Sequence, residues 1–155
     1  MAVIKTQGTN VYVFDGTVVT QLSCITGIDL GSDSVNRIEN TCLEERVSKG
    51  YVSGLTDPAE ASLTFNLDTA NASHLTLLTY AQTNKEGLQF YIGASDGTDP
   101  VTASGAVVTI PTTRSFWTFT GSVSAPTPSF EADALVGYTV TLQREGAVTF
   151  VPKTP

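Results

Sequence analysis

The segment Ser62-Leu63-Thr64-Phe65-Asn66-Leu67-Asp68 places an apolar side chain at every second position. Successive side chains of a β-strand point to opposite faces, so this alternation predicts a strand with one face on a core. The other face would meet solvent or a partner. The same pattern recurs at residues 88–92, 117–123 and 138–143, and less regular apolar segments lie at residues 11–14, 18–28, 106–110 and 147–151. The sequence therefore predicts an all-β fold.

One segment departs from this pattern and predicts a short amphipathic helix between residues 71 and 83. Its apolar side chains recur at helical spacing, at Ala72, Leu75, Leu78 and Ala81. Asp68 and Asn71 are both suitable N-caps. Lys85 suits the negative end of the helix dipole, and Gly87 permits the chain to reverse. We expect this helix to pack on the sheet.

Composition indicates one globular domain. The chain has 155 residues, of which 41% are hydrophobic and 15% are charged. Since a domain usually has about 100–200 residues, we expect residues 1–155 to form a single domain with its own core. The net charge of −7 disfavours sequence-specific binding to nucleic acid and binding to anionic membranes.

The N-terminal residues and the cysteines indicate a cytoplasmic site of synthesis. The first residues lack a long apolar run, so we expect no signal peptide. No apolar run approaches the roughly 20 residues that span a bilayer. Cys24 and Cys42 are then expected to be reduced. Their strand-like flanks favour buried thiols, and a disulfide would require the two strands to be neighbours.

The sequence predicts no catalytic centre. The single histidine, His74, follows Ser73, but consecutive residues of a helix point about 100° apart and do not face each other. We therefore interpret His74 as a packing or surface residue. Glu44 and Glu45 are adjacent carboxylates in a charged loop, where they are usually solvated rather than an acid–base pair.

Cofactor and metal sites are not expected either. Two separated cysteines and a distant histidine do not form a zinc pattern. Asp96 and Asp99 suit a turn better than a calcium loop. The aromatic cluster at residues 116–119 has only Arg114 beside it, which favours a core or interface strand over a surface that stacks nucleotide bases.

A long polar stretch separates two predicted strands. Residues 43–60 are rich in glycine and charge and carry no clear alternation. Irregular connections of this length are uncommon in compact domains and are often functional or ordered only on binding. We predict that residues 43–60 form a long, irregular assembly loop.

The middle third of the chain resembles the tail tube proteins of long-tailed, non-contractile bacteriophages of the lambda-like group. The resemblance rests on Asn40-Thr41-Cys42-Leu43-Glu44-Glu45, on residues 51–63 (YVSGLTDPAEASL) and on Asp68-Thr69-Ala70-Asn71-Ala72-Ser73-His74. In that family a "TCLxx" strand end precedes a loop containing "GLxDPxEAS", and an "ANASH"-type helix follows. Some relatives carry a C-terminal immunoglobulin-like domain, which we do not expect here.

The resemblance implies a β-sandwich or barrel-like fold with one helix and a structural, non-enzymatic role. Homo-hexameric rings would stack into a hollow tube in the tail of the virion, after synthesis in the host cytoplasm. DNA would pass through the lumen without sequence-specific binding. Other partners would be the tape measure, tail tip and terminator proteins. The net acidic charge fits a lumen that is negative or neutral overall.

The predicted subunit interface lies in and around the loop. Its candidate residues are Glu44, Glu45, Arg46, Lys49, Tyr51, Leu55, Asp57 and Pro58. We expect most basic residues to serve loops and interfaces, Arg46 and Lys49 in particular. The alternative functions are a type VI secretion tube protein or tail terminator, and then a carbohydrate- or receptor-binding β-sandwich.

Overall fold

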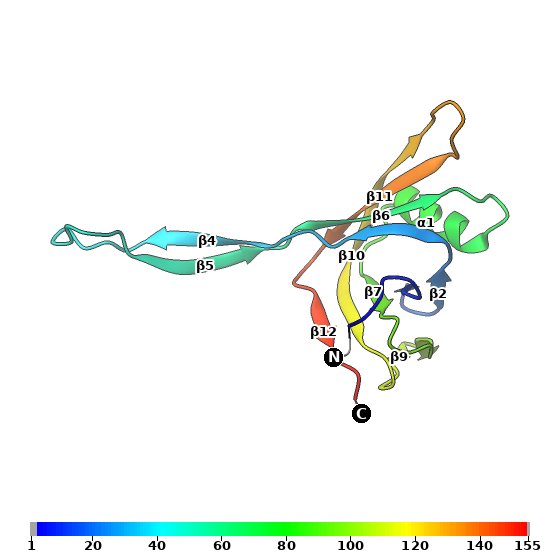
Figure 1. Ribbon diagram of the computed structural model, residues 1–155, viewed down its shortest axis with the longest axis horizontal. Helices are drawn as coiled ribbons and strands as arrows, with labels where there is room; N and C mark the ends of the chain where they lie inside the picture. The colour runs from blue at the N-terminus through cyan, green and yellow to red at the C-terminus, as the bar shows by residue number, and fades with distance from the viewer. Residues whose placement is uncertain (1–2, 155) are drawn as a thin grey trace.

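An open antiparallel sheet of eight strands forms the body of the protein (Figure 1). The computed structural model describes residues 3–154, apart from the side chain of Ala125. The sheet order is β2-β1-β7-β10-β11-β6-β3, and β12 also pairs with β10. The strands are β1 (Asn10–Phe14), β2 (Val19–Leu22), β3 (Ile25–Asp29), β6 (Glu60–Asn66), β7 (Leu88–Gly93), β10 (Phe116–Ser129), β11 (Gly137–Arg144) and β12 (Thr149–Val151). The all-β prediction is confirmed.

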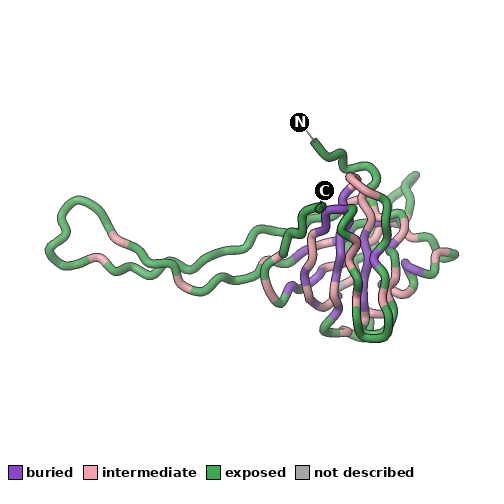
Figure 2. The backbone as a smooth tube through the Cα atoms, turned by 90° about the horizontal axis from the view of Figure 1, so that it is seen from below, coloured by how far each residue is buried: buried purple, intermediate pink, exposed green. Residues whose placement is uncertain are grey.

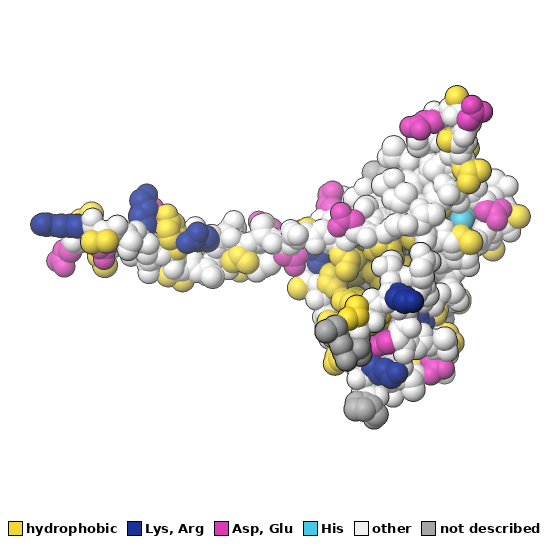
Figure 3. Space-filling view, in the orientation of Figure 1, with side chains coloured by type: hydrophobic (Ala, Val, Ile, Leu, Met, Phe, Trp, Pro, Cys, Tyr) yellow, Lys and Arg dark blue, Asp and Glu magenta, His cyan; other side chains and the backbone are white. Residues whose placement is uncertain are grey.

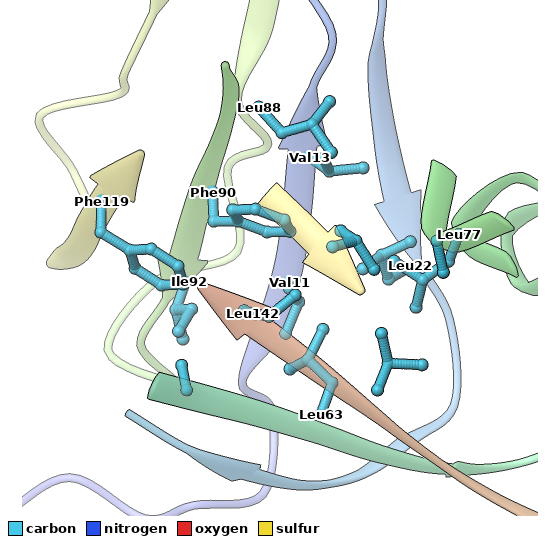
Figure 4. Close-up of a cluster of buried hydrophobic side chains, with 14 of the residues drawn as sticks. Val11, Val13, Leu22, Leu63, Leu77, Leu88, Phe90, Ile92, Phe119 and Leu142 are labelled. Atoms are coloured by element: carbon cyan, nitrogen blue, oxygen red, sulfur yellow. The ribbon is translucent and has the colours of Figure 1, made fainter. Parts of the chain in front are cut away.

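The apolar face of this sheet encloses the main core (Figure 4). Alternation decides which side chains enter it, so Ala61, Leu63 and Phe65 of β6 are buried while the residues between them are not. The same rule brings in Phe90, Phe119 and Leu142 from β7, β10 and β11. Burying one such side chain stabilises the fold by about 1.5–3 kcal/mol.

Helix α1 (Ala72–Gln82) packs against this core, as predicted. Asn71 caps it by accepting a hydrogen bond from the Ser73 main-chain nitrogen at 3.1 Å, and Leu77 and Ala81 are buried. Among the residues that the structure describes, no helix is long and apolar enough to cross a membrane.

His74 joins the helix to the corner between β2 and β3. Its ring is fully buried, with Nε2 2.7 Å from the carbonyl oxygen of Ser23, and Nδ1 accepts from the Asp68 main-chain nitrogen at 3.2 Å. The Ser73 hydroxyl accepts from the Ser23 main-chain nitrogen at 3.2 Å. His74 is thus a packing residue, and it holds the corner at which β2 becomes β3.

A two-stranded ribbon extends far from the body (Figure 1). It consists of β4 (Ser34–Glu39), β5 (Tyr51–Asp57) and the turn between them, and we call residues 34–57 the arm. The prediction that residues 43–60 form an irregular loop was therefore wrong for Tyr51–Asp57, which is a strand, and for Glu60, which begins β6. Figure 2 shows that nearly the whole arm is exposed, in contrast to the body.

A small hairpin covers one part of the outer face of the main sheet. It consists of β8 (Thr102–Ser104) and β9 (Val107–Thr109). Together with Val101 it encloses a second apolar cluster with Tyr12, Phe14, Tyr91 and Phe116 of the sheet. The aromatic strand at residues 116–119 therefore belongs to the core, as expected.

The two cysteines differ from expectation, since Cys24 and Cys42 are both free and exposed. Residues 18–28 do not form one strand but break at Ser23–Cys24, where Cys24 adopts a left-handed backbone with φ of 57°. Cys42 lies in the turn of the arm, beyond the end of β4. Neither side chain contributes to the core.

Candidate assembly surfaces

The arm carries all but one of the predicted interface residues. Its turn holds Glu44, Glu45, Arg46 and Lys49, and β5 holds Tyr51, Leu55 and Asp57. Pro58 follows at the root. All eight are exposed, and basic side chains lie at the far end of the arm in Figure 3. The structure thus brings them onto one projecting element.

One face of the arm is aliphatic. Cross-strand partners share a face, so Ile38 lies beside Val52, whereas Val35 lies on the opposite face together with Arg37. Ile38 and Val52 are 59% and 50% exposed. An isolated two-stranded hairpin is marginally stable at best in water, so an uncovered aliphatic face of this kind indicates a surface for a partner.

The opposite face of the arm is mostly polar. Lys49 forms an ion pair with Glu39 at 3.4 Å, and the Arg37 guanidinium lies 4.2 Å from the centre of the Tyr51 ring. Both contacts are exposed, and exposed ion pairs contribute only about 0–1 kcal/mol. They organise the ribbon locally rather than stabilise the whole protein.

The turn of the arm is ordered by Glu45. Its carboxylate accepts hydrogen bonds from the main-chain nitrogens of Val47 and Arg46, both at 3.0 Å. These backbone donors, with Val47 foremost, hold the pKa of Glu45 below its usual value. Beside it, Leu43 and Val47 are almost completely exposed.

The root of the arm is firmly attached to the body. Buried Arg144 donates through Nε to the carbonyl oxygen of Ala59 at 3.0 Å and also pairs with Asp33. Asp33 accepts from the Ala59 main-chain nitrogen at 3.1 Å. This backbone contact, and then Arg144, lower the pKa of Asp33. The arm therefore projects from a fixed base.

Arg114 is a second buried cation, and the sequence did not predict its burial. It donates to the carbonyl oxygens of Ala94 (2.6 Å), Gly93 (3.0 Å) and Gly8 (3.1 Å), and to Oδ1 of Asn10 (2.6 Å). Of the basic residues, Arg114 and Arg144 thus serve the interior rather than loops or interfaces. Arg46 and Lys49 lie in the arm, as expected.

The surface offers no recognisable catalytic constellation in the described part of the chain. An open depression over β7 and β10 is lined mainly by neutral side chains, including Gln89, Thr118 and Thr120, with Glu145 as its one carboxylate. Among the described residues, no group of three or more His, Cys, Asp or Glu side chains is placed to hold a metal ion.

Residues 2–154 match a protein-family model described as phage tail tube, TTP, lambda-like. The chain is also 32% identical over 158 residues to structural protein 3 of Pseudomonas phage PAJU2, covering 97% of this chain and 95% of that protein.

Solved structures share the fold at low sequence identity. A chain of the anti-feeding prophage baseplate, 6-fold symmetrised, superposes with a TM-score of 0.67 at 10% identity over 100% of both chains. The SPP1 tail tube gives 0.60 at 12% identity, over 98% of this chain and 81% of that one. The tail of an empty gene transfer agent particle, refined with C6 symmetry, gives 0.62 at 11% identity, over 95% and 98%.

Proposed function

The chain belongs to the lambda-like phage tail tube family, and from this premise we propose that six copies form a ring and that rings stack into a hollow tube that conducts DNA. As a member of that family it is a structural subunit of the tail tube and is located in the tail of the virion. The role is structural, and we assign it no catalysis.

The arm is the observation that carries the proposal. It extends from a fixed root, exposes aliphatic side chains over its length and buries almost nothing within its own chain. Such a ribbon is stabilised when another surface covers its aliphatic face. In a repeating assembly, a neighbouring copy offers every arm the same covering surface. We propose that the arm contacts another subunit in the assembled tube.

The open sheet supports a ring. Its end strands, β2 and β3, each pair with one neighbour in the described sheet and so present a free edge. Free edges pair readily with other chains, and a head-to-tail contact closes a ring when its rotation is an integral fraction of a turn. The sixfold symmetry of two structural neighbours favours six copies.

The predicted interface residues retain their proposed role in stacking. Glu44 and Arg46 are exposed in the turn of the arm. Leu43 and Val47, which flank them in the sequence, are exposed apolar side chains available for contact with another subunit. In the tube these residues would contact the next ring. The other predicted interface residues, which follow along the arm towards its root, would extend this contact: Lys49, Tyr51, Leu55, Asp57 and Pro58. At the ends of the tube, the partners would be the tape measure, tail tip and terminator proteins.

Electron microscopy of the concentrated protein tests this function. We expect long tubes with a regular axial repeat. A preparation that forms only single rings would favour a connector or terminator, and a preparation that stays monomeric would contradict self-assembly.

A shortened arm provides the matched variant. Deleting residues 41–49 joins Asn40 to Gly50, which leaves an Asn-Gly turn between the paired residues Glu39 and Tyr51. The core lies elsewhere, so this variant should unfold with a midpoint close to that of the unaltered chain but should form no tubes. Tubes as abundant as those of the unaltered chain would contradict the role of the arm.

Hydrogen exchange provides a second readout. The arm amides should exchange rapidly in the monomer and slowly in tubes, because the contact that covers them forms only on assembly. Equal protection of the arm in both states would count against this role.

A further inference from the structure

The turn between β10 and β11 projects from the body and is both apolar and acidic. Residues 130–136 connect the paired residues Ser129 and Gly137, and we call them the acidic turn. Phe130 and Leu135 are 77% and 73% exposed. Figure 1 shows this hairpin extending beyond the rest of the sheet, and carboxylates gather at its tip in Figure 3. The turn thus presents large apolar side chains that its own chain leaves uncovered.

The acidic turn carries negative charge without a nearby cation. Its carboxylates belong to Glu131 and Asp133, and neither forms an ion pair in the described part of the chain. Residues 115–143 contain no Lys or Arg. The turn is nevertheless held in place, because the Leu67 main-chain nitrogen donates to the carbonyl oxygen of Val136 at 2.8 Å. Exposed apolar side chains flanked by carboxylates indicate a contact surface for a cationic partner.

A depression at the other end of β10 has complementary properties. The N-terminal segment and the loop after β7 supply its lining: Val3, Ile4, Lys5, Gln7, Ser95 and Asp96. Val3 and Ile4 are 78% and 43% exposed. This N-terminal depression, as we call it, has a volume of about 330 Å³, which admits an aromatic side chain.

The N-terminal depression is built on fixed contacts and leaves cations exposed. The Ser95 hydroxyl donates to the carbonyl oxygen of Lys5. The Asp96 carboxylate accepts from the main-chain nitrogen and the hydroxyl of Ser115, at 3.1 and 2.7 Å, and the Lys153 ammonium donates to the Asp96 carbonyl oxygen at 3.2 Å. Lys5 is exposed and forms no ion pair among the described residues. The depression therefore combines apolar side chains with ammonium groups.

The two surfaces lie at opposite ends of one strand. Strand β10 begins directly after Ser115, which binds Asp96, and ends at Ser129, where the acidic turn starts. A strand of 14 residues spans roughly 45 Å when extended, so the turn cannot reach the depression of its own chain. Figure 1 accordingly places the hairpin and the chain ends on opposite sides of the body. Rings stacked in one orientation make head-to-tail contacts, which join two different patches of the subunit.

We propose that the acidic turn of one copy docks in the N-terminal depression of a copy in the next ring. This inference rests on the proposed tube and adds a contact between rings that is separate from the arm. Phe130 packs against Val3 and Ile4, and Glu131 lies near Lys5. The turn of the arm is a poorer occupant of the depression, because its charges are mixed and it carries no aromatic side chain.

Cysteine cross-linking of assembled tubes tests this contact. With Cys24 and Cys42 replaced by Ser, Ala132→Cys places a thiol in the acidic turn and Gln7→Cys places one in the depression. A short bis-maleimide should join such subunits into covalent chains longer than six copies, because each link connects one ring to the next. The same double variant should give no chains before assembly, since its two thiols lie at opposite ends of the subunit.

A matched pair of thiols provides the control. Thr79→Cys, on the exposed side of α1, replaces Gln7→Cys and should give no chains with Ala132→Cys. Chains that stop at six copies would place the contact within one ring and overturn the proposal, and so would tubes of the test pair that do not cross-link. Failure of the unaltered chain to form tubes would instead contradict the proposed function.

A charge exchange tests the chemistry of the contact. Glu131→Lys and Lys5→Glu should each raise the critical concentration for assembly at low salt by about two- to fivefold, because each brings like charges together. The combined variant should restore assembly, since the pair is then only reversed. Glu86→Lys, the same change at an exposed site after α1, should have no effect. A combined variant that assembles no better than either single variant would overturn the proposal.

Removal of the aromatic ring separates docking from folding. Phe130→Ala should raise the critical concentration on the order of tenfold. It should leave the unfolding midpoint of the monomer unchanged, because the ring is exposed there. Leu75→Ala, at an exposed side chain of α1, should alter neither. Assembly of Phe130→Ala equal to that of the unaltered chain would overturn the proposal, even if the cysteine pair prevented assembly.

Discussion

At the scale of single residues, Arg114 shows how a cation is retained in the interior without a carboxylate partner. Its donors meet main-chain carbonyls at two separate places, near Gly8 and near Gly93–Ala94. A Cβ on Gly93 would lie 2.6 Å from the guanidinium carbon, so a side chain is excluded there. The position thus requires both the arginine and a glycine.

We predict that Arg114→Lys destabilises the monomer by about 3 kcal/mol or more. Lysine carries a compact ammonium group and cannot reproduce the planar set of donors, so several buried carbonyls lose their partners. Urea unfolding of the unassembled chain measures this. Lys153→Ala, at an exposed cation near the same corner, should change stability by less than about 1 kcal/mol. Equal effects of the two changes would contradict the role assigned to Arg114.

Asp15 gives a prediction about pH. Main-chain nitrogens of Val18 and Thr17 donate to its carboxylate at 2.8 and 2.9 Å, and Tyr80 donates at 3.1 Å. These contacts, with Val18 first, hold the pKa of Asp15 well below its usual value. Burial, and then the Asp15 charge, raise the pKa of Tyr80 to about 12.

A lowered pKa in the folded state means that Asp15 stabilises the protein above its unfolded pKa of about 4 and ceases to do so as the pH falls. We predict that Asp15→Asn lowers the free energy of unfolding by about 1–2 kcal/mol at pH 7. The difference from the unaltered chain should shrink steadily between pH 4 and pH 2. A difference that stays constant over this range would exclude the charge of Asp15 as its cause.

At the scale of elements, sequence alternation located the strands that have one face on the core. Residues 62–68, 88–92, 117–123 and 138–143 fall in β6, β7, β10 and β11 or run one or two residues beyond them. The helix at 71–83 and its Asn71 cap are likewise confirmed, but its buried face consists of Ser73, His74, Leu77 and Ala81. The predicted apolar face was wrong for Ala72 and Leu75, which are exposed. In the four strands, burial of one face imposed the periodicity that the sequence displays.

The arm escaped prediction for two physical reasons. In β4 the apolar residues Val35 and Ile38 are three positions apart, so they lie on opposite faces and break the period of two. In β5, no face is buried against a core, so Tyr51–Asp57 shows no consistent alternation. The interface role of these residues stays a prediction, because a single subunit contains no interface.

Glu44 provides the cleanest test of the arm in assembly. We predict that Glu44→Lys weakens tube formation and that the loss depends on salt, because the change reverses an exposed charge in the turn. Light scattering at 50 and 500 mM salt measures the critical concentration. Glu45→Lys also removes the acceptor that orders the turn, so it should weaken assembly at both salt concentrations. Assembly of Glu44→Lys equal to that of the unaltered chain would contradict the contact.

At the scale of the whole molecule, the body and the arm divide two tasks. The body contains both apolar clusters of the core, and the arm extends away from it as an exposed ribbon. Figure 2 makes this division visible, since the buried segments lie in the body.

We predict that each contact between neighbouring subunits of a ring buries on the order of 2,000 Å² or more. Edge pairing and docking of the arm together provide surface of that extent, and an obligate assembly requires it. Cryo-electron microscopy of the tubes gives the area directly. Small, hydrated contacts of the size found in crystal packing would be incompatible with the proposed tube.

The order of strands in the main sheet also bears on how the chain is made. Strands β1 and β6 lie early in the sequence, yet β6 pairs with β11, and β1 joins β10 only through β7. During synthesis, β6 therefore cannot pair with β11 until residues 137–144 have left the ribosome. Sheets built from such distant pairings fold slowly, on timescales of milliseconds to seconds. Only a nearly finished chain can close its core, so polymerisation on a growing tube draws on completed subunits rather than nascent ones.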